Sequence, residues 1–411
     1  MVSTHTVVVS LISIVLFYIA AAQGRKTLHT NNEFFASSPV TNNYDGICKT
    51  IVETQGYTCE EHTVTTDDGY ILSLQRIPVG RSGKKADKPP VLIQHGIFSD
   101  AAVWLFNSPE ESLGFILADI GFDVWLINGR GTKYSTNHTS LSPNDMAYWD
   151  WSWDELAGYD LPASAQYVYN HTGQKMHYVG HSQGTLIAFA AFSQGKLLNV
   201  FRSAALLSPI AHMTQIPSEL TKIAAQLFLA NDIYWLGLRE FVPHADIGIK
   251  LLDGICTILS LNCTNRLLPL FTGPNCCINS SKVDSYLDHE PQPTATKNLI
   301  HFSQLIRKGQ ISKYDYVDEA QNLQHYGQRV PPTYDVTKIP SEFPLFLSYG
   351  GKDTLSDVQD VKVLFNELNN DHDASNRVVL FKDDYAHLDF ILGDNAKQVV
   401  YDPMIAFFNA H

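Results

Sequence analysis

The sequence lacks several features that would assign it to other classes of protein. It has no Cys-x-x-Cys pair, and the spacing of its vicinal pair, Cys276 and Cys277, suits no common zinc site. It also has no Gly-x-Gly-x-x-Gly loop for a dinucleotide, no internal repeat and no low-complexity tract. We therefore expect the protein to hold neither a metal ion nor a cofactor.

Positive charge is scarce as well. Lys and Arg together number 29 against 42 for Asp and Glu, so the formal net charge is −13 at pH 7. No basic patch with interleaved aromatic residues is present, which argues against nucleic acid as a partner. The negative charge also disfavours electrostatic capture by an anionic membrane, so any contact with lipid should be apolar.

Only the start of the chain is almost wholly apolar over a long run. Residues 7–22 form this run, no Lys or Arg precedes it, and it ends in three alanines suited to signal peptidase. A membrane-spanning helix needs about 20 apolar residues, and no later segment reaches that length. We therefore predict a cleaved signal peptide over 1–22 rather than a transmembrane anchor. The protein should then lie outside the cell or in a vacuolar or lysosomal lumen. Four sequons fit a glycoprotein of this pathway: Asn137, Asn170, Asn262 and Asn279.

The six cysteines suit disulfides in the oxidising lumen of the same pathway. Cys48 and Cys59 stand close together in the N-terminal segment, and we predict that they pair. The other four cluster in the middle of the chain: Cys256, Cys263, Cys276 and Cys277. Four cysteines allow three pairings, and the sequence does not choose among them.

The most informative motif is Gly-His-Ser-Gln-Gly at 180–184. Residues 176–179 predict a short buried strand before it, and an apolar stretch after it predicts a helix. Gly-x-Ser-x-Gly between a strand and a helix is typical of the nucleophile elbow of α/β-hydrolases. In that turn Gly180 and Gly184 avoid clashes with the neighbouring strand and helix, and the serine stands near the positive end of the helix dipole. The motif therefore predicts that Ser182 is a nucleophile.

A serine nucleophile needs a base, and the base needs an acid to orient it. In this fold the acid and then the histidine follow the serine along the chain. An apolar strand that begins near residue 344 leads to Asp353, and a second strand at 378–381 leads to His387. The carboxyl ends of such strands form the active-site edge of the sheet. We therefore assign Asp353 as the acid and His387 as the base.

Other residues compete for these roles. Asp357 and Asp360 lie on what reads as a helix after Asp353, where carboxylates are usually solvated. His181 is too close in sequence to Ser182 to act as its base, so we expect it to pack locally. Three further carboxylates stand near His387, and we expect them to shape its loop: Asp383, Asp384 and Asp389.

The oxyanion of the reaction should be stabilised by two backbone N–H groups. One should belong to the residue after the nucleophile, Gln183, and the other to the loop after an early strand. The strand at 90–94 is followed by His95 and Gly96. Gly96 would let the chain turn closely enough for the N–H of Ile97 to face the oxyanion.

With these residues in place, the chain resembles the acid lipase family of gastric and lysosomal acid lipases, and within it the plant members. The resemblance covers nearly the whole mature chain and is weakest across 210–337. It implies an α/β-hydrolase fold with the triad and oxyanion donors assigned above, and long-chain acyl esters of glycerol or sterol as substrates. The stretches that carry it are Val64–Pro78, Gln94–Gly96, Phe115–Trp125, Trp153–Ala163, Tyr178–Thr185, Tyr349–Val361 and Tyr385–Phe390.

The strand signals divide the chain into a core and an insertion. Up to residue 209 strands alternate with helical stretches, as a mostly parallel sheet requires, and the pattern then turns helical. We therefore predict an α/β-hydrolase core formed by 23–209 and 338–411, with a mainly helical cap or lid inserted at 210–337. The apolar stretches at 220–238 and 247–261 can be the cap's own core, or one face can cover the active site and withdraw at a lipid surface. We favour a mobile lid.

A cluster of aromatic residues at 148–153 also allows two interpretations. It can bind lipid, or it can pack against the core, and we favour packing.

Together these observations predict a serine hydrolase that cleaves lipid esters at a lipid–water interface through an acyl-enzyme. A general carboxylesterase, an acyltransferase or a serine peptidase would carry the same triad. A non-catalytic lipid-binding protein is disfavoured, because such a protein usually loses a member of the triad. The oligomeric state does not follow from the sequence.

Overall fold

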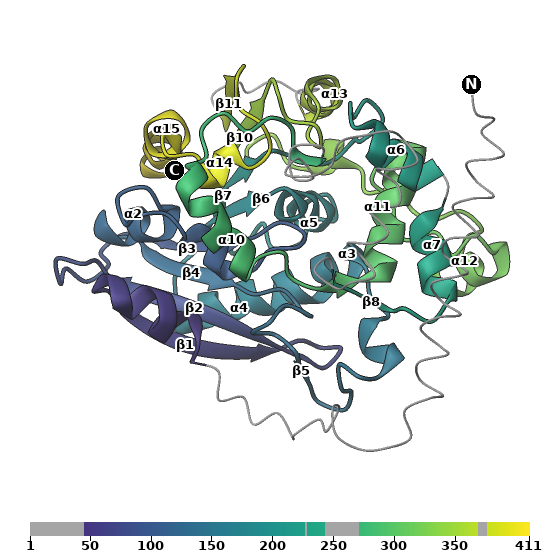
Figure 1. The fold of residues 1–411 in the computed structure, drawn as a ribbon, viewed down its shortest axis with the longest axis horizontal. Coiled ribbons are helices and arrows are strands. Elements are labelled where there is room, and N and C mark those ends of the chain that lie inside the picture. Colours follow the sequence, from purple (N-terminus) through teal and green to yellow (C-terminus); the bar gives the residue numbers. More distant parts are fainter. Residues whose placement is uncertain (1–44, 227, 243–270, 369–375) are drawn as a thin grey trace. The chain divides into compact units, whose positions relative to one another are not determined.

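The computed structural model describes residues 45–226, 228–242, 271–368 and 376–411 (Figure 1). Several sequence predictions lie outside the described residues: the signal peptide at 1–22, Asn262, Cys256, Cys263 and the helix at 247–261. Within the described ranges, no helix has both the length and the apolar character that crossing a membrane would take.

A central sheet organises the described chain. Its strands lie in the order β1, β2, β4, β3, β6, β7, β10, β11, and the short β5 pairs with β2. From β4 to β11 each neighbouring pair is parallel, which confirms the mostly parallel sheet. The first strands differ from the predicted strand–helix alternation, because β1 pairs antiparallel with β2 and β2 with β4. The strands are β1 Thr58–Thr65, β2 Tyr70–Val79, β3 Pro90–Gln94, β4 Asp123–Ile127, β5 Asn137–His138, β6 Met176–His181, β7 Phe201–Leu207, β10 Leu345–Gly350 and β11 Arg377–Lys382.

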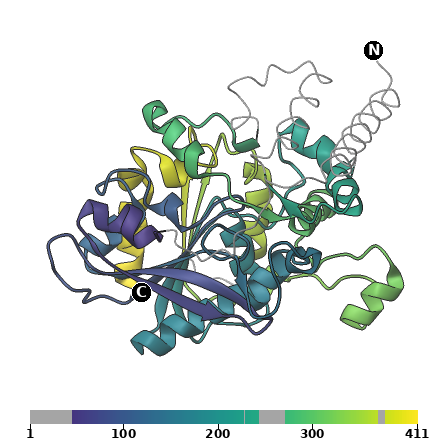
Figure 2. The ribbon, with the colours of Figure 1, turned by 60° about the horizontal axis from the view of Figure 1, so that its bottom comes forward.

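The middle strands are buried on both faces. In β3, Val91 and Ile93 pack in one hydrophobic cluster and Leu92 packs in another, because successive side chains of a strand point to opposite faces. This double burial explains why the strands read as continuous apolar runs. The face with Leu92 is covered by α4 Leu161–Thr172 and α5 Gln183–Phe192, and the other by α2 Leu113–Asp119 and α15 Asp402–Ala410 (Figures 1 and 2).

Between β7 and β10 the described chain adds no strand to the central sheet. This insertion contains α6 Glu219–Gln226, α7 Leu229–Trp235, β8 Glu240–Phe241, α10 Val283–His289, β9 Thr294–Ala295, α11 Thr296–Lys308 and α12 Glu319–Tyr326. Helix α11 packs against α6 and α7 (Figure 1). The apolar stretch at 220–238, predicted as one helix, is two, because Phe228 has a left-handed φ of 55° at the start of α7.

The aromatic cluster at 148–153 packs inside the molecule. Its four aromatic side chains are buried, which confirms packing over exposure to lipid: Tyr148, Trp149, Trp151 and Trp153. Nearby, the loop after β4 is anchored by Arg130, which is fully buried and pairs with Asp160 and Asp68.

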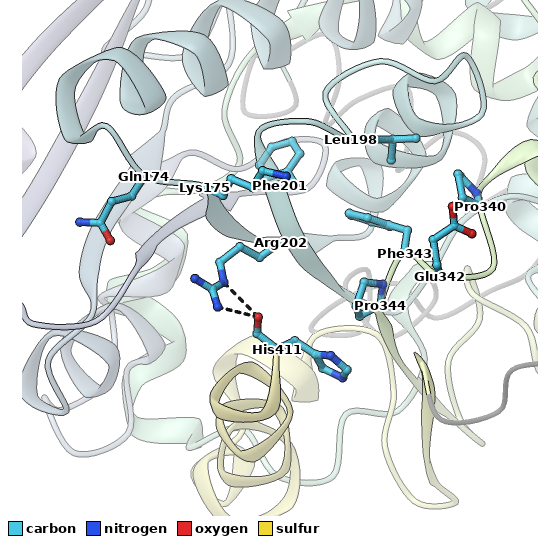
Figure 3. Close-up of a pocket in the computed structure, with 10 residues that line it drawn as sticks. All are labelled: Gln174, Lys175, Leu198, Phe201, Arg202, Pro340, Glu342, Phe343, Pro344 and His411. Atoms are coloured by element: carbon cyan, nitrogen blue, oxygen red, sulfur yellow. Dashed lines mark hydrogen bonds between the residues drawn. The ribbon is translucent and has the colours of Figure 1, made fainter.

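A pocket of about 590 Å³ opens at the amino ends of three parallel strands (Figure 3). Lys175 precedes β6, Arg202 lies at the start of β7 and Pro344 precedes β10. The guanidinium of Arg202 donates to the carbonyl oxygen of His411 at 2.7 and 3.0 Å. Reactive residues of such sheets follow the carboxyl ends of the strands, so this pocket lies at the opposite edge.

Candidate active site

Ser182 occupies the turn between β6 and α5. Its φ of 53° and ψ of −117° form a backbone conformation that residues with side chains rarely adopt. The turn requires glycine on both sides. A Cβ at Gly180 would lie 2.8 Å from the carbonyl of Gly184, and a Cβ at Gly184 would lie 2.7 Å from the carbonyl oxygen of Gln94. The serine therefore stands alone at the tip of a crowded turn.

Asp353 and His387 meet at the carboxyl edge of the sheet, where they follow β10 and β11. Nδ1 of His387 lies 2.9 and 3.0 Å from the two carboxylate oxygens of Asp353, and both side chains are buried. Because Nδ1 donates to this carboxylate, Nε2 of the neutral ring is left as the acceptor. The N–H groups of Leu355 and Ser356 also donate to Asp353, at 2.9 and 2.8 Å, and fix its orientation.

The surroundings of Asp353 keep it ionised. Burial by itself would raise the pKa of this carboxyl, but the charge and hydrogen bond of His387 and the two N–H donors outweigh burial and lower the pKa below its usual range. An ionised Asp353 can stabilise a positive charge on the imidazole when the ring takes up a proton.

His181 joins the serine turn to the histidine loop, a role that the sequence did not reveal. Its Nε2 donates to the carbonyl oxygen of His387 at 2.9 Å, and the two rings are 4.7 Å apart. Burial lowers the pKa of His181 to about 3, so the ring stays neutral beside His387. No hydrogen bond of the described chain joins Ser182 Oγ to His387 Nε2, and catalytic bonds of this kind often tighten only when substrate binds.

The loop after β3 approaches the serine closely. A Cβ at Gly96 would lie 3.0 Å from Cβ of Ser182, a tight contact that glycine avoids. His95 holds the loop with both ring nitrogens: Nδ1 donates to the carbonyl of Gly96 at 2.7 Å, and Nε2 accepts from the N–H of Gly129 at 2.9 Å. Burial lowers the pKa of His95, which keeps the ring neutral in this role.

The N–H groups of Ile97 and Gln183 are free for an oxyanion. Neither one donates a hydrogen bond within the described part of the chain. The side chain of Gln183 is fixed separately, since its Nε2 donates to Oδ1 of Asn298 at 3.1 Å.

The competing acids have other partners. Asp357 accepts from the N–H of Gln359 at 2.7 Å, just before α13 Val358–Leu368. Asp360 is buried rather than solvated, which corrects the expectation for it, because its carboxylate accepts from Thr214 and Gln215. Of the carboxylates near His387, two are exposed and one is fully buried: Asp383, Asp384 and Asp389 respectively.

The insertion covers this site. Ser182 is only 6% exposed. The N–H of Gln292 donates to the carbonyl of Phe98 at 2.8 Å, which ties the insertion to the oxyanion loop. The cavity between them, lined by Ile97, Gln183 and Thr294 among others, measures about 20 Å³. That volume holds about one water molecule.

The described cysteines form two disulfides, Cys48–Cys59 and the vicinal pair Cys276–Cys277. Among the sequons, Asn137 and Asn170 are exposed, and Asn279 is half-buried and caps a short helical turn.

Comparison with known proteins agrees with this fold and site geometry. Residues 48–108 match the family described as a partial alpha/beta-hydrolase lipase region, and residues 89–394 match the alpha/beta hydrolase fold. Triacylglycerol lipase 2 of Arabidopsis thaliana is 45% identical over 401 residues, which cover 97% of this chain and 96% of that protein. Gastric triacylglycerol lipase of Rattus norvegicus is 38% identical over 362 residues, with 85% and 88% covered.

A solved structure supports the fold alone. A soluble variant of monoglyceride lipase from Saccharomyces cerevisiae aligns with a TM-score of 0.54 at 14% identity and covers 86% of this chain and 95% of that one. The sequence relatives carry the family assignment, because both exceed a third identity over most of their own length. The chain therefore belongs to the acid lipase family, a group of ester hydrolases with the α/β-hydrolase fold.

Proposed function

We propose that the protein is a serine lipase that hydrolyses long-chain acyl esters of glycerol or sterol, with Ser182 as nucleophile, His387 as base and Asp353 as the acid that orients it. The observation that carries the proposal is the buried Asp353–His387 pair beside a serine in a strained turn. Its relatives' names point to the same substrate class, since one is a triacylglycerol lipase and another a gastric triacylglycerol lipase.

The geometry supports a two-step reaction. Nε2 of His387 takes the proton of Ser182 as Oγ attacks the ester carbonyl, and the ionised Asp353 stabilises the imidazolium. The N–H groups of Ile97 and Gln183 donate to the oxyanion. The imidazolium then protonates the leaving alcohol, and water attacks the acyl-enzyme by the same route to release the fatty acid.

We propose further that residues 210–337 form a cap that moves away from the site. Ser182 is only 6% exposed, and the N–H of Gln292 binds the carbonyl of Phe98 in the loop after β3, so an opening would give a long-chain ester more room. The net charge of −13 disfavours electrostatic attraction to anionic lipid, so the protein should bind lipid through apolar side chains. Four apolar side chains of α7 and its ends are exposed and suit that contact: Phe228, Trp235, Leu236 and Leu238.

The secretory pathway is the proposed location, either the cell exterior or a vacuolar or lysosomal lumen. The disulfide Cys48–Cys59 and the exposed sequons at Asn137 and Asn170 suit an oxidising, glycosylating compartment.

The test compares wild type and Ser182→Ala on emulsified triolein, emulsified cholesteryl oleate and soluble p-nitrophenyl butyrate, together with labelling by a fluorophosphonate. Wild type should hydrolyse the emulsions and be labelled at Ser182. The variant should fold, remain unlabelled and lose activity by orders of magnitude. More than about 1% residual turnover in Ser182→Ala, at matched protein purity, would contradict the assignment of the nucleophile.

A general carboxylesterase is the alternative, because it would use the same residues. It would act on the soluble butyrate and not on the emulsions, so the same assay separates the two functions.

A further inference from the structure

The loop that carries His387 is held by a segment of the insertion rather than by the sheet alone. This segment, residues 271–278, is called the strap here. It precedes α10 in sequence and runs between the loop with Asp353 and the loop with His387. It forms hydrogen bonds with both loops, from which it is more than 70 residues away in sequence.

At the acid side, the strap lies against residues 352–354. The hydroxyl of Thr354 donates to the carbonyl of Phe271 at 2.5 Å. Gly273 has a φ of 87°, and a Cβ there would lie 2.0 Å from the carbonyl oxygen of Lys352. The strap therefore touches the residues on both sides of Asp353.

On the side of His387, the strap accepts hydrogen bonds from the backbone of the loop. The N–H of His387 donates to the carbonyl of Thr272 at 3.0 Å, and the N–H of Leu388 donates to Oδ1 of Asn275 at 3.0 Å. The carbonyl of His387 is already bound to His181. The main chain of His387 is thus fixed at both its amide and its carbonyl.

Asp389 connects the strap to this loop. Its side chain is fully buried and accepts three N–H groups: that of Ala386 at 2.7 Å, that of Cys276 at 3.1 Å and that of Cys277 at 3.0 Å. The two cysteines are consecutive and joined by a disulfide, which constrains the backbone between their N–H groups, and both groups reach the same carboxylate. Burial raises the pKa of Asp389, while these three donors pull it the other way.

We propose that Asp389 is a positioning residue for His387, which acts by binding the strap to the loop that carries the imidazole. This inference rests on the proposed function, in which His387 is the base. Asp389 touches neither the substrate site nor the imidazole in the described structure, and it sets the loop geometry through three main-chain bonds. A carboxylate suits this position because both of its oxygens accept, whereas an amide would turn an NH₂ group toward N–H donors.

The test uses the full-length secreted enzyme as wild type, Asp389→Asn, Asn275→Ala and Asp394→Asn. Asn275→Ala removes the second side-chain bond between strap and loop. Asp394→Asn is the matched control: its N–H still bonds to the carbonyl of Cys277, and its half-buried side chain lies 3.8 Å from Lys282 and accepts no hydrogen bond from the strap in the described structure. The fraction of active sites is titrated with a fluorophosphonate, and kcat and KM on p-nitrophenyl butyrate are expressed per titrated site.

Asp389→Asn should lower kcat per titrated site by about 10- to 100-fold with KM nearly unchanged, because small misplacements of a catalytic group cost this much. Asn275→Ala should lower it less, and Asp394→Asn should match wild type. If Asp389→Asn and Asn275→Ala reduce only the number of titrated sites, with kcat per site unchanged, the strap is merely structural and the inference is wrong. A wild type that does not titrate at Ser182 would instead overturn the proposed function.

Discussion

The backbone at Ser182 holds its strained conformation because neighbouring residues fix it by a hydrogen bond and by close contact. Its own N–H donates to the carbonyl of Leu207 at 3.1 Å, which fixes the turn to β7. Gly96 closes the space on the other side of the side chain. A residue with φ above zero is costly by about 1 to 3 kcal/mol, and such conformations persist where the surroundings determine them fully. The strain is therefore local evidence for a site at this turn.

The orienting acid can be tested by a matched pair of substitutions. Asp353→Asn should cut kcat by roughly 10⁴, because an amide can hold His387 in the wrong tautomer. Asp357→Asn is the control, since Asp357 only accepts from the N–H of Gln359. Steady-state kinetics of both variants on p-nitrophenyl butyrate is the measurement. A large loss in Asp357→Asn with a small loss in Asp353→Asn would reverse the assignment of the acid.

Residues whose role is local could be predicted from the sequence, and residues whose role depends on distant contacts could not. The glycines around Ser182 lie within its own turn, so the motif indicates the crowding there directly. The bond from His181 to His387 joins residues 206 apart, and the sequence suggested only local packing for His181. The prediction that Asp360 is solvated was wrong for the same reason, because its hydrogen-bond partners Thr214 and Gln215 are 146 and 145 residues away in sequence.

At the scale of elements, four parallel strands bring the residues of the proposed site to the same edge of the sheet. β6 leads to the serine turn, β10 to Asp353 and β11 to His387, and β3 leads to the oxyanion loop. Parallel pairing is what brings these four ends together. The sequence indicated β3, β6 and β10 clearly, because buried parallel strands are short apolar runs. The bounds of the helices in the insertion were harder to predict, since one left-handed residue divides the stretch at 220–238 into two helices.

Helix α7 offers a test of lipid contact. Trp235 is 79% exposed, and Trp235→Asp should lower activity on emulsified triolein by about tenfold or more, because burying a large aromatic side chain contributes about 1.5 to 3 kcal/mol. Activity on soluble p-nitrophenyl butyrate should stay near wild type. Rates on both substrates, measured at equal active-site concentration, give the comparison.

Val379→Asp is the matched control for that experiment. Val379 is 47% exposed and lies on β11, the edge strand of the sheet. The substitution therefore adds the same charge as Trp235→Asp, at an exposed apolar position outside the cap. Equal losses on emulsion for both variants would show that added charge alone weakens lipid binding, and the role of α7 would have to be abandoned.

At the scale of the whole molecule, the insertion and the core depend on each other. The strap of residues 271–278 fixes the loop of His387, and Gln292 closes the loop after β3. Both segments are bonded to the core: the strap binds the buried Asp389, and Gln292 accepts from the N–H of Lys133 at 3.0 Å and donates through its own N–H to Phe98. Opening of the cap would have to break one of these two sets of bonds.

The stability of the folded enzyme should depend on pH through its buried histidines. Burial lowers the pKa of His177 to about 3, against an ordinary value of about 6.5 in an unfolded chain. Between these two pH values the unfolded chain binds a proton at this position and the folded chain does not. The free energy of unfolding therefore falls as pH decreases below about 6.5, by up to about 1.4 kcal/mol per pH unit for this one group.

His177→Phe isolates that contribution. The ring of His177 stacks on Phe408 at 4.4 Å, which phenylalanine can preserve, and the lost bond to Ser203 at 2.8 Å costs stability equally at every pH. Chemical unfolding at pH 7, 6, 5 and 4 should show the variant less stable than wild type at pH 7, with the gap closing as the solution becomes more acidic. Parallel stability curves for the two proteins would mean that His177 is protonated in the folded state and that its burial does not exclude the proton. A gap that closes as the pH falls means that the buried, neutral ring of His177 makes the fold less stable in acid.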